Sequence, residues 1–122
     1  MEESASSPTP LSIHIKITVH PENSETYLAA LRPLFEEATA EPLNIFCEVY
    51  RDDKNPGVFR IVENWNCSLD HMMNVQMKKD YYNPYYEATE SLFIKPQVIE
   101  IFSRMPGTDW VRVKKEFYPG RS

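Results

Sequence analysis

The alternation of apolar and polar positions predicts strands at four places along the chain. Residues 11–19, LSIHIKITV, put branched apolar side chains on one face and polar ones on the other, which is the period-two pattern of a half-buried strand. Residues 44–51 and 58–65 are predicted as two more strands. The intervening segment 52–57, DDKNPG, is rich in turn-forming residues, so the two strands should form an antiparallel hairpin. A fourth strand is predicted over residues 97–104, QVIEIFSR.

Two helical regions separate these strands. Apolar residues at helical spacing predict a helix over residues 24–41, with a kink at Pro33. A second helical region is predicted over residues 68–92, where Pro84 should break it into two short helices. The order of elements is therefore β-α-β-β-α-β. This order predicts an α+β, ferredoxin-like fold with a four-stranded antiparallel sheet.

Both helical regions should cover one face of this sheet and leave the other face bare. The residues from which we expect the bare face to be drawn are His14, Lys16, Phe46, Tyr50, Val58, Val62, Ile99 and Ile101. A large, partly apolar surface of this kind usually meets a protein partner. A second copy related by a two-fold axis is the simplest partner, so the pattern predicts a homodimer.

The amino-acid composition indicates one folded domain with a short segment outside it at each end of the chain. The 122 residues are 42% hydrophobic and 25% charged, which is the profile of one globular domain. Residues 1–10 are acidic and rich in Ser and Pro, so we expect a disordered leader and no signal peptide. Residues 11–105 should form the folded domain. Residues 106–122 should form a C-terminal arm, either an extra strand or an arm on a neighbouring subunit.

Charge and cysteine content narrow the classes of protein. The net charge of −5 disfavours nucleic-acid binding. No apolar run is long enough to cross a membrane, so we expect a cytoplasmic protein without membrane contact. Cys47 and Cys67 are expected to be free thiols, because neither a disulfide framework nor a metal-binding spacing is present. The chain also has too few glycines for a phosphate loop. We therefore predict no cofactor and no metal.

Three short segments, taken in order, resemble one protein family. These are Ala38-Thr39-Ala40-Glu41-Pro42, the acidic turn that ends in Pro56-Gly57, and Glu63-Asn64-Trp65. With the order of elements, they make residues 12–105 similar to the antibiotic biosynthesis monooxygenase family. The resemblance implies a dimeric α+β barrel with a cavity in each subunit between sheet and helices. It also implies oxidation of aromatic, polyketide-type substrates by molecular oxygen without metal or flavin.

One departure from the family concerns haem. Many members carry a helix histidine where this chain has Asn74, and His71 lies one helical turn earlier. The haem-degrading branch combines a Trp, this helix His and an Asn on the first strand. Only Trp65 matches that set, so the resemblance does not point to haem degradation.

Candidate site residues follow from the resemblance and from their chemistry. We expect His71 to act as general base, because its ordinary pKa of about 6.5 suits proton transfer at neutral pH. Trp65 should form a pocket wall that stacks on the substrate. The remaining substrate-binding candidates, which supply polar contacts or deformable apolar walls, are Asn74, Gln76, Tyr82, Tyr85, Met72 and Met73. Each also has a plainer interpretation, as a core residue or as a solvated position on a helix.

Three functions remain open at this point. The leading hypothesis is a cofactor-independent monooxygenase that acts on a small aromatic or polyketide-type metabolite. The first alternative is cyclisation, dehydration or isomerisation in the same pocket. The second is a non-catalytic module for ligand binding or protein interaction.

Overall fold

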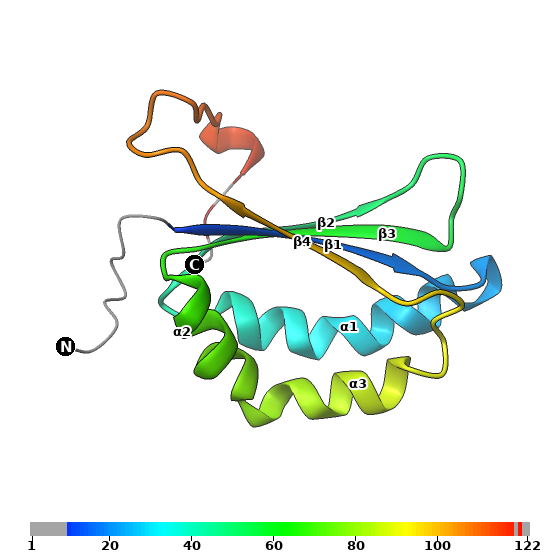
Figure 1. Cartoon of the computed structure of the whole chain (residues 1–122). Coiled ribbons are helices and arrows are strands. Elements are labelled where there is room, and N and C mark those ends of the chain that lie inside the picture. Colours follow the sequence, from blue (N-terminus) through cyan, green and yellow to red (C-terminus); the bar gives the residue numbers. More distant parts are fainter. Residues whose placement is uncertain (1–9, 119, 121–122) are drawn as a thin grey trace.

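The computed structural model describes residues 10–118 and 120, and it confirms the predicted order of elements (Figure 1). The predicted leader falls almost wholly on residues 1–9, outside the described part. The strands are β1 Leu11–Thr18, β2 Asn44–Arg51, β3 Val58–Trp65 and β4 Val98–Ser103. The helices are α1 Ser24–Thr39, α2 Leu69–Asn74 and α3 Asn83–Thr89, with short 3-10 turns at Pro21–Asn23, Gln76–Lys78, Asp80–Tyr82 and Lys115–Phe117. Among the described residues, no helix is long and apolar enough to cross a membrane.

The four strands form one antiparallel sheet in the order β2-β3-β1-β4. The three α-helices lie on one side of it, and on the opposite side the described residues form no α-helix, only the 3-10 turn of the C-terminal arm (Figure 1). This is the α+β, ferredoxin-like arrangement that the pattern predicted. The two outer strands are β2 and β4, so β4 forms the edge above the second helical region.

The pairing of β4 with β1 corrects one prediction about the bare face. Ile13 pairs with Ile101 and Ile15 pairs with Ile99, and residues directly opposite in a sheet share a face. Ile99 and Ile101 therefore point to the helix side. On β4 it is Val98, Glu100 and Phe102 that lie on the bare face, where the Phe102 ring lies 4.7 Å from that of His14. Alternation within β4 left both sets possible, and only the register decides between them.

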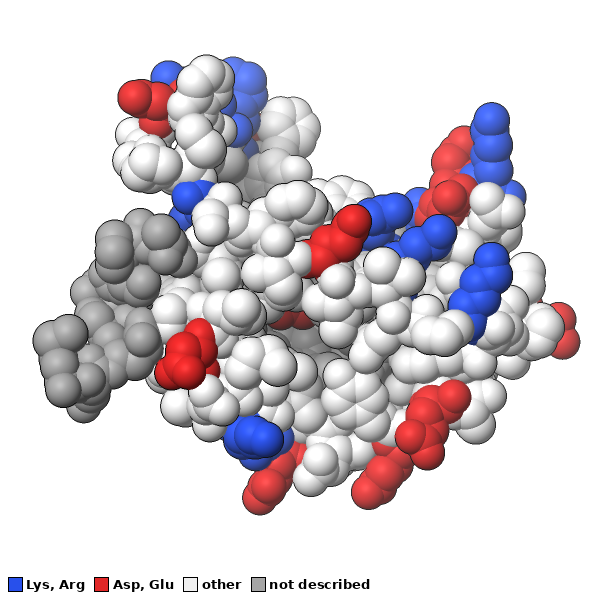
Figure 2. Space-filling view, in the orientation of Figure 1, with Lys and Arg blue, Asp and Glu red and all other residues white. Residues whose placement is uncertain are grey.

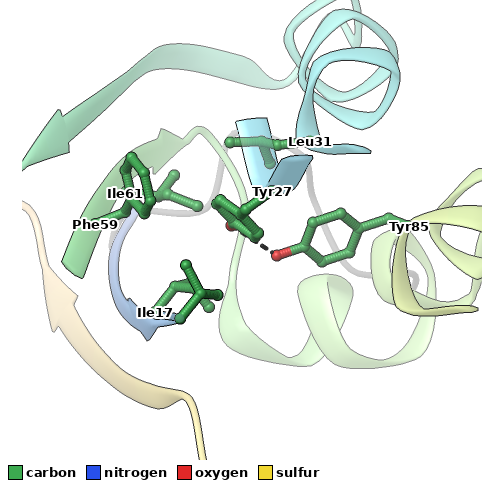
Figure 3. Close-up of a cluster of buried hydrophobic side chains, with 7 residues drawn as sticks. Ile17, Tyr27, Leu31, Phe59, Ile61 and Tyr85 are labelled. Atoms are coloured by element: carbon green, nitrogen blue, oxygen red, sulfur yellow. Dashed lines mark hydrogen bonds between the residues drawn. The ribbon is translucent and has the colours of Figure 1, made fainter. Parts of the chain in front are cut away.

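The main core lies between the middle of the sheet and helices α1 and α3. Figure 3 shows Ile17, Tyr27, Leu31, Phe59, Ile61 and Tyr85 converging there. Tyr27 of α1 is fully buried, and its hydroxyl lies 2.8 Å from that of Tyr85 of α3. Because two buried hydroxyls satisfy each other, α3 is tied to α1 by a specific hydrogen bond as well as by packing.

A second core cluster lies at the α2 end of the sheet. It contains Leu11, Ile13, Ala38, Trp65, Cys67 and Met72. Trp65 and Cys67 have no exposed surface. Cys67 and the partly buried Cys47 form no disulfide with each other, as predicted. The α2 end of the domain is therefore packed around the tryptophan, and the cavity described below lies beside this cluster.

The prolines have different effects in the two helical regions. Helix α1 continues through Pro33 and ends at Thr39, slightly before the predicted end. The second region is broken, as predicted, but Pro84 lies in the first turn of α3. At that position a missing backbone N–H costs nothing, because the first helical N–H groups have no intrahelical partner. Pro84 therefore begins a helix.

The C-terminal arm leaves β4 on the bare side of the sheet (Figure 1). Its described residues form no strand, and their one helical element is the 3-10 turn Lys115–Phe117. The Tyr118 ring packs 5.9 Å from that of Phe46 on β2 of the same chain. The prediction of an extra strand is therefore wrong for the part of the arm that the structure describes, and contact with a second subunit stays a prediction.

Candidate active site

A cavity of about 110 Å³ lies between the sheet and the helices. Its walls come from all four strands, from α1, α2 and α3, and from the turns at Gln76–Lys78 and Asp80–Tyr82. Figure 2 shows this face hollowed between β4 and the helices, with acidic atoms visible deep in the hollow. The lining is almost entirely apolar or aromatic, which is typical of a site for a small organic ligand.

The rim of the cavity is apolar and accessible. It includes Leu69 and Met73 of α2, Met77 of the following turn, and Ile99 and Ile101 of β4, which are between 36% and 55% exposed. These five side chains line the cavity and also reach solvent, so a ligand can enter between β4 and α2. Methionine side chains are flexible and adapt to ligands of different shape.

Glu63 is the carboxylate in this lining. It lies on β3 in the row of helix-side residues, between Ile61 and Trp65. Burial raises its pKa, and the hydrogen bond from Trp65 opposes that effect. Trp65 Nε1 donates this bond to Glu63 Oε1 over 2.8 Å. Within residues 10–118 the other oxygen, Oε2, has no hydrogen-bond partner, so it remains available to a ligand.

Two tyrosines and one cysteine thiol in the lining have raised pKa values and keep their protons near neutral pH. Burial is the main cause that raises the pKa of Tyr82 and of Tyr85 to about 12. Burial likewise raises the pKa of the Cys47 thiol, and the nearby Glu63 charge adds to the effect. Glu63 is therefore the lining group best suited to exchange a proton at neutral pH.

A polar network outside the cavity fixes the orientation of Tyr82. Gln76 Nε2 donates to the Tyr82 hydroxyl over 2.9 Å and to the Tyr81 hydroxyl over 2.6 Å. Tyr81 in turn donates to Glu41 Oε2 over 2.7 Å, and Lys79 Nζ donates to the same oxygen over 2.8 Å. The network joins the 3-10 turns after α2 to the chain just beyond α1. Gln76 does not line the cavity, but its side chain bonds to Tyr82, which does. Gln76 therefore supports a residue of the cavity wall.

Four of the residues proposed as substrate contacts are cavity residues. Met72, Met73, Tyr82 and Tyr85 all line it. Met72 is buried against the Trp65 cluster, whereas Met73 lies at the rim. Their binding role stays a prediction that this geometry supports.

The structure does not bring the other candidates to the cavity surface. His71 and Asn74 do not line it, and the Asn74 amide donates to Asp70 Oδ1 over 2.8 Å at the surface. Helix α2 turns Leu69, Met72 and Met73 inward, and this spacing defines one face of a helix. His71 and Asn74 lie off that face. Trp65 is fully buried and reaches the cavity only through its bond to Glu63.

Glu63 lines the cavity but is not among the site residues expected from the sequence. Its signal was present, because Phe59, Ile61, Glu63 and Trp65 form one face of the predicted strand and only one of them is charged. A charged residue in an apolar row is uncommon, and it usually indicates a paired or functional group. Cys47, Ile99 and Ile101 were also missed as lining residues, since only the sheet register assigns them to this side.

Comparison with known proteins gives the same fold and a family. The structure of a conserved protein from Methanosarcina mazei Go1 matches 82% of this chain and 97% of its own, with a TM-score of 0.71 at 20% identity. A solved structure described as an antibiotic biosynthesis monooxygenase matches 79% of this chain and 99% of its own, with a TM-score of 0.69 at 19% identity. At such identities these structures support the fold alone.

Sequence similarity is more specific. The protein named "Putative monooxygenase GME11364" from Pestalotiopsis microspora is 50% identical over 115 residues, which cover 93% of this chain and 96% of that protein. The family model described as "Antibiotic biosynthesis monooxygenase" matches residues 10–73, just over half of the chain. That match includes β1, α1, the β2–β3 hairpin with Glu63 and Trp65, and most of α2. The chain thus belongs to the antibiotic biosynthesis monooxygenase family.

Proposed function

We propose that the protein is a small monooxygenase that binds a neutral aromatic metabolite of polyketide type in the cavity below β4 and oxidises it with molecular oxygen. Family membership and the 50% identical relative support a monooxygenase-like role. The observation that carries the proposal is an apolar cavity, open at a methionine-containing rim, with a single carboxylate in its wall. Such a site binds a planar apolar ligand and offers one group for proton transfer.

The proposed reaction converts an activated methylene group into a carbonyl group. Loss of a proton from the methylene leaves a carbanion, stabilised as an enolate by the neighbouring aromatic system. The carbanion supplies electrons to O₂, and a carbon–oxygen bond forms to give a hydroperoxide. Loss of the second hydrogen as a proton then breaks the oxygen–oxygen bond and releases water. The substrate supplies all the electrons that O₂ accepts, so the overall reaction requires no external reductant and therefore no bound cofactor.

The rim offers a direct test of this site. The reaction to follow is uptake of O₂ by metal-free protein with anthrone as the probe, because anthrone has an activated methylene between two aromatic rings. Met73→Trp should narrow the entrance and lower kcat/KM by about tenfold or more, as misplacement of a substrate by a small distance commonly does. Val75→Trp is the matched control, since Val75 is similarly exposed nearby but does not line the cavity.

The outcomes separate this proposal from its alternatives. Wild-type protein that takes up no O₂ with anthrone or a quinol would contradict oxygenation. The same cavity and carboxylate would also serve cyclisation, dehydration or isomerisation, each of which requires a positioned acid or base. Turnover in the absence of O₂ would select that class. Tight binding of the probe without any turnover would instead indicate a ligand-binding module.

A homodimer belongs to the same proposal. The bare face exposes Tyr50 on β2 and Val98 and Phe102 on β4, each between 44% and 50% exposed. A second copy packed on this face would bury them and close two sheets around a common interior. Light scattering after size-exclusion chromatography would measure the mass in solution. A monomeric mass across micromolar concentrations would contradict the dimer.

A further inference from the structure

We propose that Glu63 is the group that takes the proton from the bound substrate, and that Trp65 acts as a positioning residue that holds the Glu63 carboxylate in place. This inference rests on the proposed function, because it names the base for that reaction. It also restricts the substrate class to neutral molecules with an acidic C–H bond. His71, the base expected from the sequence, does not line the cavity.

The first argument is the position of the carboxylate. Glu63 lies in the middle of the sheet on β3, paired with Ile13 of β1 on one side and Cys47 of β2 on the other. Both neighbours also line the cavity. The carboxylate therefore emerges from the floor of the cavity, opposite the helices. A flat ligand lying against the sheet would place its edge beside Glu63 Oε2.

The second argument is the free-energy cost of burying this carboxylate in an apolar cavity wall. An ionised group in an apolar site is stable only when it is paired or fully hydrogen-bonded. Among the described residues no Lys, Arg or His contacts Glu63, and its one hydrogen bond comes from Trp65. The strand could hold an apolar residue here, as it does at Phe59 and Ile61. A costly acceptor that points into a cavity and has a free oxygen is typical of a functional group.

The third argument is the geometry of Trp65. Residues two apart on a strand share a face, so the indole of Trp65 reaches the carboxylate directly. The indole N–H is bonded to Oε1 over 2.8 Å, and Trp65 itself is fully buried and packed within its cluster. One oxygen is thereby held while the other faces the cavity. Because the bond favours the ionised carboxylate, it also keeps Glu63 a usable base despite its burial.

The proton-transfer step is balanced within the cavity. Glu63 Oε2 takes a proton from the methylene as the C–H bond breaks, and the electron pair stays on the substrate as an enolate. The carbon then donates electrons to O₂ and forms a C–O bond. The proton held on Glu63 passes to the distal oxygen, which completes the hydroperoxide and regenerates the carboxylate. The same carboxylate then takes the second methylene proton as the carbonyl forms and the O–O bond breaks, and it passes this proton to the departing hydroxide, which leaves as water.

The lining also predicts which substrates are excluded. The titratable groups that share the cavity lining with Glu63 are the phenols of Tyr82, Tyr85 and Tyr86 and the thiol of Cys47. No Lys or Arg lines the cavity among the described residues. An anionic substrate would therefore lie beside the Glu63 carboxylate without a compensating cation, which is unfavourable at low dielectric. Anthrone should react, and an anthrone that carries a carboxylate should react much more slowly.

The decisive experiment measures proton abstraction separately from oxygenation. Anthrone labelled with deuterium at its methylene is incubated with protein in the absence of O₂, and loss of deuterium is followed by mass spectrometry. Wild-type protein should accelerate the loss above the buffer rate. Glu63→Gln should lower this acceleration by about 10² or more, the usual contribution of a general base. Glu87→Gln, which removes an exposed carboxylate on α3, should behave as wild type.

A second variant tests the positioning role of Trp65. Trp65→Phe removes the N–H that favours the ionised form, so the pKa of Glu63 should rise further. The pH at which deuterium loss becomes fast should therefore move upward relative to wild type. A uniform loss of rate with an unchanged pH profile would show that Trp65 has only a structural role. In a Trp110→Phe background, the fluorescence of Trp65 should titrate with pH, and Glu63→Gln should abolish that titration.

The two proposals fail in different ways. Deuterium loss that depends on Glu63 without O₂ uptake would overturn the oxygenation and support the base. Deuterium loss at the wild-type rate in Glu63→Gln, provided its circular dichroism matches wild type, would overturn the base whatever the O₂ result. Wild-type protein that exchanges no deuterium would overturn the base as well. Equal rates for anthrone and its carboxylated analogue would overturn the restriction to neutral substrates.

Discussion

The two faces of the sheet give two carboxylates very different surroundings. Glu48 and Glu63 lie on the paired strands β2 and β3, where Glu63 is opposite Cys47 and Glu48 is opposite Val62. Glu48 faces the bare side and accepts a hydrogen bond from the Tyr50 hydroxyl over 2.8 Å, in an exposed setting. Glu63 faces the helices, lines the cavity and is bonded to a buried indole. The pleat of the sheet alone produces this difference.

The comparison extends to the aromatic residues. On the helix side, Trp65 has no exposed surface and Tyr27 and Tyr85 pair in the core. On the bare side of the sheet, Tyr50 is half exposed, and in the arm Trp110 is 75% exposed. The helix side therefore holds the packed core of the domain, and the cavity lies within it. The bare side still has apolar surface to bury, so the contrast can be tested by paired substitutions.

The largest expected effect separates the two tryptophans. Trp65→Ala should lower the free energy of unfolding by about 3–5 kcal/mol, because it opens a cavity in the core. The change also removes the one donor that, among the described residues, bonds to the Glu63 carboxylate. Trp110→Ala should change stability by less than about 0.5 kcal/mol, as exposed substitutions usually do. Urea denaturation followed by circular dichroism measures both, and equal losses would contradict the contrast between core and arm.

The next effect concerns association through the bare face. Phe102→Glu should place a charge in the centre of the proposed interface, which costs about 2 kcal/mol or more and raises the dimer dissociation constant roughly 30-fold. Analytical ultracentrifugation over a range of concentrations measures that constant. Ser91→Glu, at an exposed position after α3, is the control and should leave it unchanged. The bare face would not be the interface if both variants dimerised like wild type.

A smaller effect should separate the two tyrosine hydrogen bonds. Tyr85→Phe keeps the ring but removes the partner of the buried Tyr27 hydroxyl, so stability should fall by roughly 1–1.5 kcal/mol. Tyr50→Phe removes a bond to Glu48 that is exposed in the single subunit, so water can replace the lost partner at concentrations where the chain is monomeric. Its cost should be near zero. A loss in Tyr50→Phe as large as that in Tyr85→Phe would show that the bare face is more tightly packed than the structure indicates.

The smallest effect is a pH dependence of stability. Burial raises the pKa of Glu63 in the folded protein, so between the ordinary carboxyl value of about 4.3 and that raised value the folded state binds more protons than the unfolded state. Stability must therefore fall as pH rises through this window. Glu63→Gln lacks this ionisation and should gain stability relative to wild type as pH increases. Denaturation midpoints at several pH values measure the difference, and a difference independent of pH would contradict a raised pKa.

Much of the fold could be predicted because it depends on local patterns. The period-two runs at residues 11–19 and 58–65 indicated strands, and the turn at 52–57 indicated a hairpin. Which face of β4 meets the helices could not be predicted, since both of its faces carry apolar residues. The pairing of Ile99 and Ile101 with β1 depends on contacts across most of the chain.

The site was predicted only in part, for a related reason. Met72, Met73, Tyr82 and Tyr85 line the cavity, because apolar residues of a helical region covering a sheet point inward, and their role in substrate binding stays a prediction. His71 was chosen for its ordinary pKa, but α2 is a short helix whose inward face is taken by Leu69 and the methionines. A favourable side-chain pKa gives no information about direction.

The sequence by itself determined the order of elements, the α+β class and the presence of one charged residue in the apolar row of the third strand. These features depend on neighbours a few positions apart, and backbone geometry turns such spacing into faces. Only the tertiary structure decided that Glu63 borders a cavity, that Trp65 donates to it, and that His71 does not line that cavity. Those facts depend on how α2 packs against the sheet and on the register of β4, which join segments distant in the chain.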